Sequence, residues 1–123
     1  MAVPIPSLHH VQVFYPAGRE DEARRFYGEL LGLPEIPRPE TLRDRDGLWF
    51  AAGGGHVHLS VDADLALHPR RHFGLRVARL DPLVARLRAA GARLEDATPI
   101  PGWRRLYVVD PFGNRVELDE IGG

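Results

Sequence analysis

The chain of 123 residues has the size of one domain, and it is long enough to bury a core without a disulfide or a metal. Its 44% hydrophobic and 27% charged residues and its formal charge of −1 are ordinary for a globular protein and do not favour nucleic-acid binding. The chain has no cysteine, which excludes disulfide scaffolds, thiolate metal sites and a cysteine nucleophile. Six histidines remain available for metal or proton chemistry.

The sequence contains no run of 18 apolar residues that would predict a membrane span. Residues 1–8 hold two prolines and no charged segment, so they do not resemble a signal peptide. We therefore expect a cytoplasmic protein.

The first half of the chain predicts one helix among several strands. Apolar residues between Ala23 and Leu31 recur at helical spacing behind an acidic first turn, which predicts an amphipathic helix that ends at Gly32. The remaining segments alternate as strands do or carry turn residues: a strand over 8–15, a short edge strand and a loop within 33–47, and a hairpin of strands 48–52 and 56–61 around glycines 53–55.

The second half repeats this order after a linker over 63–71. A strand over 72–77 precedes a helix that we expect to start at Asp81-Pro82, with Asp81 as its N-cap, and to close at Gly91. Three more strands are predicted, over 93–98, 103–109 and 115–120, with a turn-forming Asp-Pro-Phe-Gly-Asn loop before the last one.

The order β-α-β-β-β therefore occurs twice, which predicts an α+β fold. We expect the two βαβββ repeats to form a curled mixed sheet with the helices on its outer face. The expected organisation is a single domain over 1–123, with repeat one at about 7–62, the linker at 63–71 and repeat two at about 72–120.

Superposing the repeats places residues that bind metals at equivalent positions. Gly32 lies 26 residues before His58, and Gly91 lies 26 residues before Glu117, so His58 falls over Glu117. Each of these residues, like the equivalent pair His10 and His72, lies on the first or last strand of its repeat. Imidazole and carboxylate together suit zinc, nickel, iron, cobalt or manganese. We therefore predict a divalent-metal site with these four ligands: His10, His58, His72 and Glu117.

Two segments of the chain resemble a known group of proteins. Two segments are similar to recurring motifs of the vicinal oxygen chelate superfamily. They are residues 23–33, Ala-Arg-Arg-Phe-Tyr-Gly-Glu-Leu-Leu-Gly-Leu, and residues 110–118, Asp-Pro-Phe-Gly-Asn-Arg-Val-Glu-Leu. The opening Leu8-His9-His10-Val11 is also similar. The superfamily includes glyoxalase I, fosfomycin-resistance and bleomycin-resistance proteins and extradiol dioxygenases.

The resemblance implies a metal-dependent enzyme that acts on a small molecule. In the superfamily a divalent metal chelates two adjacent substrate oxygens, and the reactions include isomerase, lyase and transferase chemistry. Carried over by position, the ligands are again His10, His58, His72 and Glu117, with Glu117 or His58 moving a proton. Glyoxalase I commonly has a glutamate where this chain has His58, so glyoxalase I activity itself is not implied.

Several points stay open at the level of sequence. His56 shares a strand face with His58 and can replace it as a ligand. Members of the superfamily are often dimers, so we expect a homodimer whose site forms either within one chain or across two. A metal-free protein that binds a small molecule or an antibiotic is the alternative function.

Other side chains are assigned to the substrate pocket or to the scaffold. Trp49 and Tyr107 occupy matching places in the two repeats and are candidate pocket walls. His9 is expected to face the helices, and His68 to be solvated in the linker. The full set of candidate pocket residues comprises Trp49, Tyr107, Gln12, Phe14 and Arg105.

Overall fold

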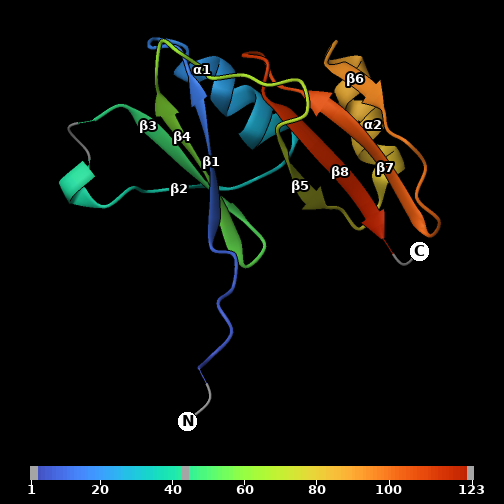
Figure 1. Cartoon of the computed structure of the whole chain (residues 1–123). Helices are drawn as coiled ribbons and strands as arrows, with labels where there is room; N and C mark the ends of the chain where they lie inside the picture. Colours follow the sequence, from blue (N-terminus) through green and yellow to red (C-terminus); the bar gives the residue numbers. More distant parts are fainter. Residues whose placement is uncertain (1–2, 43–44, 122–123) are drawn as a thin grey trace.

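The computed structural model describes residues 3–42 and 45–121, and its strands form two four-stranded sheets (Figure 1). The first half of the chain forms one sheet in the order β1-β4-β3-β2, from His10–Tyr15, Gly55–Val61, Gly47–Ala52 and Glu35–Ile36. The second half forms the other sheet in the order β5-β8-β7-β6, from His72–Arg76, Arg115–Ile121, Trp103–Val109 and Arg93–Asp96. We call these halves module 1 and module 2.

Strand pairing confirms the two βαβββ repeats. In module 1, β1 runs parallel to β4 and places Gln12 opposite His58. In module 2, β5 runs parallel to β8 and places Gly74 opposite Glu117. His58 and Glu117 therefore occupy the same register position of their repeats, as the superposition of the sequence predicts.

The helical segment of module 1 packs against the core and contributes the buried side chains of Phe26 and Tyr27. Helix α1, Glu20–Ala23, continues directly as the π-helix η1, Arg24–Leu30, in which the Leu31 amide donates to the Phe26 carbonyl. Gly32 follows with a φ of +79°, the left-handed conformation that ends the helix as predicted. A 3-10 turn, Glu40–Leu42, lies before β3, and residues 43–44 of the segment predicted as an edge strand and a loop lie outside the described residues.

The two sequence motifs, residues 23–33 and 110–118, meet at the contact between the modules. The Tyr27 hydroxyl of η1 donates a 2.7 Å hydrogen bond to Oδ2 of Asp110, in the loop before β8. Both residues are buried, and Asp110 also accepts hydrogen bonds from the Phe112 and Asn114 amides. Asn114 donates to the Phe14 carbonyl at the end of β1. These motifs therefore join the modules.

Helix α2, Leu80–Ala89, has Arg79 at its N-cap position, two residues before the predicted N-cap Asp81. The Leu80 amide instead donates to Oε2 of Glu120 on β8, 2.7 Å away. Asp81 lies in the first turn and forms an ion pair with Arg104 on β7. The prediction was wrong because a side chain distant in the sequence supplies the acceptor that a local cap would provide.

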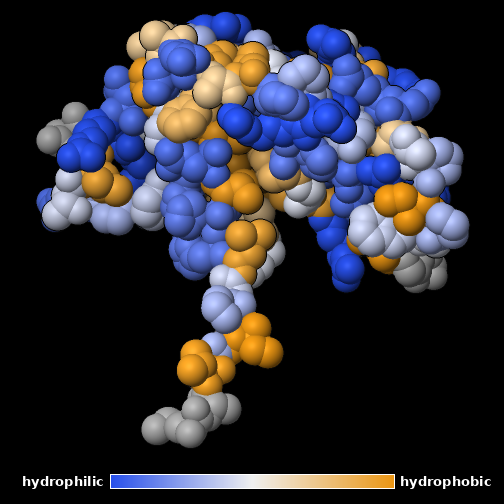
Figure 2. Space-filling model, in the orientation of Figure 1, coloured by the Kyte–Doolittle hydropathy of each residue, from blue (hydrophilic) through white to orange (hydrophobic). Residues whose placement is uncertain are grey.

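Residues 3–9 precede β1 as an extended tail that leaves the body of the molecule (Figure 2). Its apolar side chains are exposed, at 86% for Val3, 92% for Ile5 and 82% for Leu8. Within the described part of the chain, no helix is long and apolar enough to cross a membrane.

Candidate functional site

Module 1 carries a stack of aromatic rings on neighbouring strands. The His58 ring on β4 lies parallel to the Trp49 indole of β3, with ring centres 4.0 Å apart and planes 3° apart. His10 on β1 also stacks on His58, at 4.2 Å. The neighbouring strands thus leave His58 only 5% exposed, whereas His10 is exposed.

Two more histidines complete a cluster on module 1. Nδ1 of His56 lies 3.2 Å from Nε2 of His58, and Nδ1 of His9 lies 2.9 Å from Nδ1 of His10. The expectation that His9 faces the helices was wrong. His9 precedes the first residue of β1, so strand alternation does not fix its direction, and it is exposed beside His56 at a ring distance of 4.9 Å.

The surroundings of His58 hold it in its neutral form. Burial, together with the neighbouring His10, His56 and His9, lowers the pKa of His58 from 6.5 to about 4. A neutral imidazole is the form that binds a metal or accepts a proton. His58 therefore retains either capacity well below neutral pH.

Module 2 carries the second pair of predicted ligands. Nε2 of His72 on β5 lies 3.5 Å from Oε1 of Glu117 on β8. Arg105 on β7 donates from Nη1 to the same oxygen at 2.7 Å, and both side chains are largely buried. Tyr107 lies beside Arg105 and packs edge-on against the His72 ring, so the predicted wall residue contacts a predicted ligand.

Glu117 has a second carboxylate as its neighbour. Asp119 is buried on the same face of β8, and its Oδ1 has no hydrogen-bond partner among the described residues. Burial, together with the hydrogen bond and charge of Glu117, raises the pKa of Asp119 to about 6. Burial also acts to raise the pKa of Glu117, but Asp119, Tyr107 and Arg105 lower it overall, so Glu117 stays ionised at neutral pH.

Gly74 on β5 brings the backbone close to this pair of carboxylates. A Cβ at Gly74 would come within 3.2 Å of Oδ2 of Asp119 and 3.9 Å of Oε2 of Glu117. Oε1 of Glu117 is held by Arg105, so Oε2 is the oxygen on the side of Gly74. An exposed imidazole and an ionised carboxylate beside it are suitable ligands for a divalent metal.

The four predicted ligands lie in two pairs, His10 with His58 and His72 with Glu117. Across residues 3–42 and 45–121, no three histidine, aspartate or glutamate side chains already converge as a metal-binding group. One chain in this conformation thus presents two of the four predicted ligands on each module.

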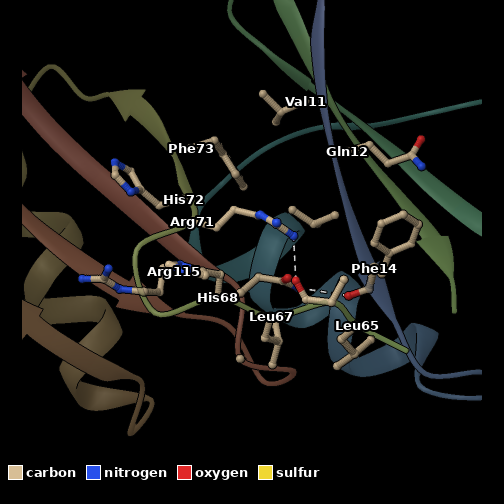
Figure 3. A pocket seen from close by; sticks show the side chains of 14 residues that line it. Val11, Gln12, Phe14, Leu65, Leu67, His68, Arg71, His72, Phe73 and Arg115 are labelled. Atoms are coloured by element: carbon tan, nitrogen blue, oxygen red, sulfur yellow. Dashed lines mark hydrogen bonds between the residues drawn. The ribbon is translucent and has the colours of Figure 1, made fainter. Parts of the chain in front are cut away.

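A cavity of about 190 Å³ lies where β1 of module 1 faces β5 of module 2 (Figure 3). The linker over 65–71 covers it, and Val11, Phe73 and Leu65 supply apolar walls. Three of the predicted residues, Gln12, Phe14 and His72, line it. Trp49, Tyr107 and Arg105 instead contact the predicted ligands directly.

The sequence model of the glyoxalase-like domain family matches residues 12–118, most of the chain. The chain belongs to the glyoxalase-like family. A glyoxalase family protein from Bacillus anthracis has a similar structure, with a TM-score of 0.90 and 40% identity over 98% of this chain and 99% of that one. A search of curated proteins gave no match.

More distant structures share the fold of this glyoxalase-like chain. The fosfomycin resistance protein FosX from Listeria monocytogenes aligns with a TM-score of 0.80 and 16% identity over 96% of this chain and 93% of that one. A glyoxalase/dioxygenase from Nostoc punctiforme aligns with a TM-score of 0.76 and 20% identity over 100% and 99% of the two chains. The fold is thus the one that the vicinal oxygen chelate resemblance implies.

Sequence reasoning did not single out Asp119 or the role of Arg105 at Glu117. The only available signal was alternation, which places Asp119 on the same strand face as Glu117. Nothing in the sequence indicates that Arg105 lies across from Asp119 and reaches Glu117, because this depends on the register of β7 with β8.

Proposed function

We propose that this protein is a metal-dependent enzyme that acts on a small molecule carrying two adjacent oxygens. The observation that carries the proposal is that His58 and Glu117 occupy equivalent register positions in the two modules. Each module also holds a second candidate ligand at the start of its first strand, His10 in module 1 and His72 in module 2. Membership of the glyoxalase-like family supports the same class of function. Isomerase, lyase and transferase reactions all belong to this class.

The residues that would hold the divalent metal are His10, His58, His72 and Glu117. His58 is neutral at physiological pH, and Glu117 is ionised, as metal binding requires. Arg105 fixes Oε1 of Glu117, and Oε2 lies on the side of Gly74. His56 lies close enough to His58 to be the alternative ligand.

When bound, the metal would act as a Lewis acid toward the chelated oxygens of the substrate and stabilise negative charge that develops there. The protein's own contribution is proton transfer and orientation. Glu117 or His58 would also accept a proton as a general base. Arg105 orients Glu117 and keeps it ionised.

We also propose that two copies of the chain complete the site. The two ligand pairs do not converge within one chain, as the described residues stand. His10 and His72 are each substantially exposed, which leaves both pairs accessible to a second molecule. A twofold dimer would then hold two equivalent sites, each with one pair from either copy.

The test is metal binding by calorimetry, together with elemental analysis, on protein stripped with a chelator and offered Zn²⁺, Ni²⁺, Co²⁺, Mn²⁺ or Fe²⁺. We expect one metal per chain. His72→Ala and Glu117→Gln should each weaken binding by at least tenfold, because each removes one ligand. His68→Ala is the matched control, since His68 is an exposed histidine that lines the cavity but belongs to neither pair.

Failure of the wild type to retain any of these metals would overturn the proposal. The cavity beside His72 would then favour the alternative, a metal-free protein that binds a small molecule. Thermal stabilisation by an organic ligand in the presence of chelator would identify that function.

A further inference from the structure

The extended tail at the start of the described chain has the properties of a segment that binds another molecule. Residues 3–8 carry no charge, and all are exposed. Val3, Ile5 and Leu8 are the most exposed large apolar side chains described. Figure 2 shows the tail as a hydrophobic projection that points away from its own body. Burial of these apolar side chains against a partner would be favourable.

The two prolines of the tail give it one edge that can pair as a strand. In an extended chain, backbone N–H groups point to opposite edges at alternate residues, so Pro4 and Pro6 fall on the same edge. That edge has no donor at either position, whereas Val3, Ile5 and Ser7 keep their N–H groups on the other edge. The tail can therefore add to one sheet edge, and its proline edge would block any further strand.

A notch suited to such a segment lies beside the base of the tail. Two strands bound it, β1 and β5, and each is the last strand of its sheet. Its volume is about 180 Å³, and its walls include Val11, Phe73 and Leu75. A terminal strand presents backbone N–H and C=O groups that an added strand can satisfy.

We propose that the tail of one copy binds in the notch of a second copy, and that the two copies exchange tails reciprocally. Leu8, His9 and His10 at the base of the tail themselves line the notch. A twofold axis near this point would therefore bring each tail next to the other notch. Six extended residues span at most about 20 Å, which is enough to cross such a contact. The tail and the notch thus lie next to each other on one surface, as an isologous exchange between two copies requires.

Sedimentation velocity over a range of concentrations tests the tail on the full chain. We expect a wild-type dimer, and we expect Ile5→Asp to raise its dissociation constant at least tenfold, because a charge replaces an apolar side chain that would be buried. Ile100→Asp is the matched control, since it places the same charge at an exposed apolar residue on module 2. A monomeric wild type, or equal dissociation constants for Ile5→Asp and wild type, would overturn the inference.

Disulfide trapping tests which molecule receives the tail. The chain has no cysteine, so the double variant Ile5→Cys with Ala52→Cys reports only the engineered pair. Ala52 lines the notch, and oxidation should yield a covalent dimer that reductant separates. The single variants control for tail–tail and notch–notch bonds. A disulfide-closed monomer would show that the tail folds back on its own chain, which would overturn the inference.

The tail inference and the proposed function fail separately. A wild-type dimer that depends on Ile5 but retains no metal would refute only the function. A metal-binding dimer that is indifferent to Ile5→Asp would refute only the role of the tail.

Discussion

His58 is the residue whose chemistry depends most on its neighbours. Its ring lies against Trp49 and His10, and this packing lowers its pKa from 6.5 to about 4. A base with a lowered pKa in the folded state stabilises the fold above pH 6.5, and that stability is lost as pH falls toward 4.

The variant His58→Phe keeps a flat ring beside Trp49 but cannot take up a proton. We expect the wild type, stripped of metal, to lose more stability than this variant between pH 7 and pH 4.5, by at most about 3 kcal/mol. Thermal or denaturant unfolding at a series of pH values measures the difference. Parallel pH profiles for the two proteins would contradict the assignment.

Arg105 acts on the candidate site through Glu117. Its 2.7 Å bond to Oε1 orients the carboxylate, and the pair is largely buried. We expect Arg105→Met to weaken metal binding by about 10- to 100-fold, the usual effect of removing a residue that orients a ligand. Calorimetric titration would show this, and Arg104→Met, on the opposite face of β7, should bind metal as the wild type does.

At the scale of elements, the contact between η1 and the loop before β8 joins the modules. Tyr27→Phe removes the hydroxyl that donates to the buried Asp110 and should lower the free energy of unfolding by about 1–3 kcal/mol. Tyr15→Phe is the matched control. Tyr15 is equally buried, but its hydroxyl lies near Glu20 without a hydrogen bond of normal geometry among the described residues.

The prediction for Tyr27 concerns stability and not chemistry. Urea unfolding of both variants gives the comparison, and an equal loss in Tyr15→Phe would mean that ring packing, and not the Asp110 bond, sets the effect. Under conditions in which both variants are fully folded, their metal affinity should equal that of the wild type, because Tyr27 lies in the core between the modules.

The start of β4 also lies close to His9, the residue before β1, and this contact limits which side chains Gly55 can be replaced by. A Cβ at Gly55 would come within 2.8 Å of the His9 carbonyl oxygen, which accepts a hydrogen bond from the His56 amide. We expect Gly55→Ala to displace this end of β1 and cost about 1–3 kcal/mol. Gly54→Ala, where a Cβ meets no atom within 4 Å, should be close to neutral in the same unfolding assay.

At the scale of the whole molecule, the two ligand pairs predict that metal binding and association are linked. If each site takes one pair from either copy, metal should stabilise the dimer, and dilution should release metal. Equilibrium dialysis at falling protein concentration measures this. An affinity for metal that does not change with protein concentration would place the whole site within one chain.

The sequence determined the repeats because hydrophobic periodicity and turn residues act locally. The helix ending at Gly32, the glycine hairpin before His56 and the last strand carrying Glu117 all follow from such patterns. The equivalence of His58 with Glu117 followed from counting residues between these elements, and the strand registers agree with it.

Only the tertiary structure decided which partners these residues have. Glu120 caps the α2 helix from β8, Arg105 holds Glu117 across two strands, and His9 joins the histidines of β4. Each of these contacts joins segments that are distant in the chain, so no local pattern predicts it. The sequence identified the four candidate ligands, whereas the packing of two sheets decided that one chain holds them as two separate pairs, because strand register and module contacts fix where each side chain lies.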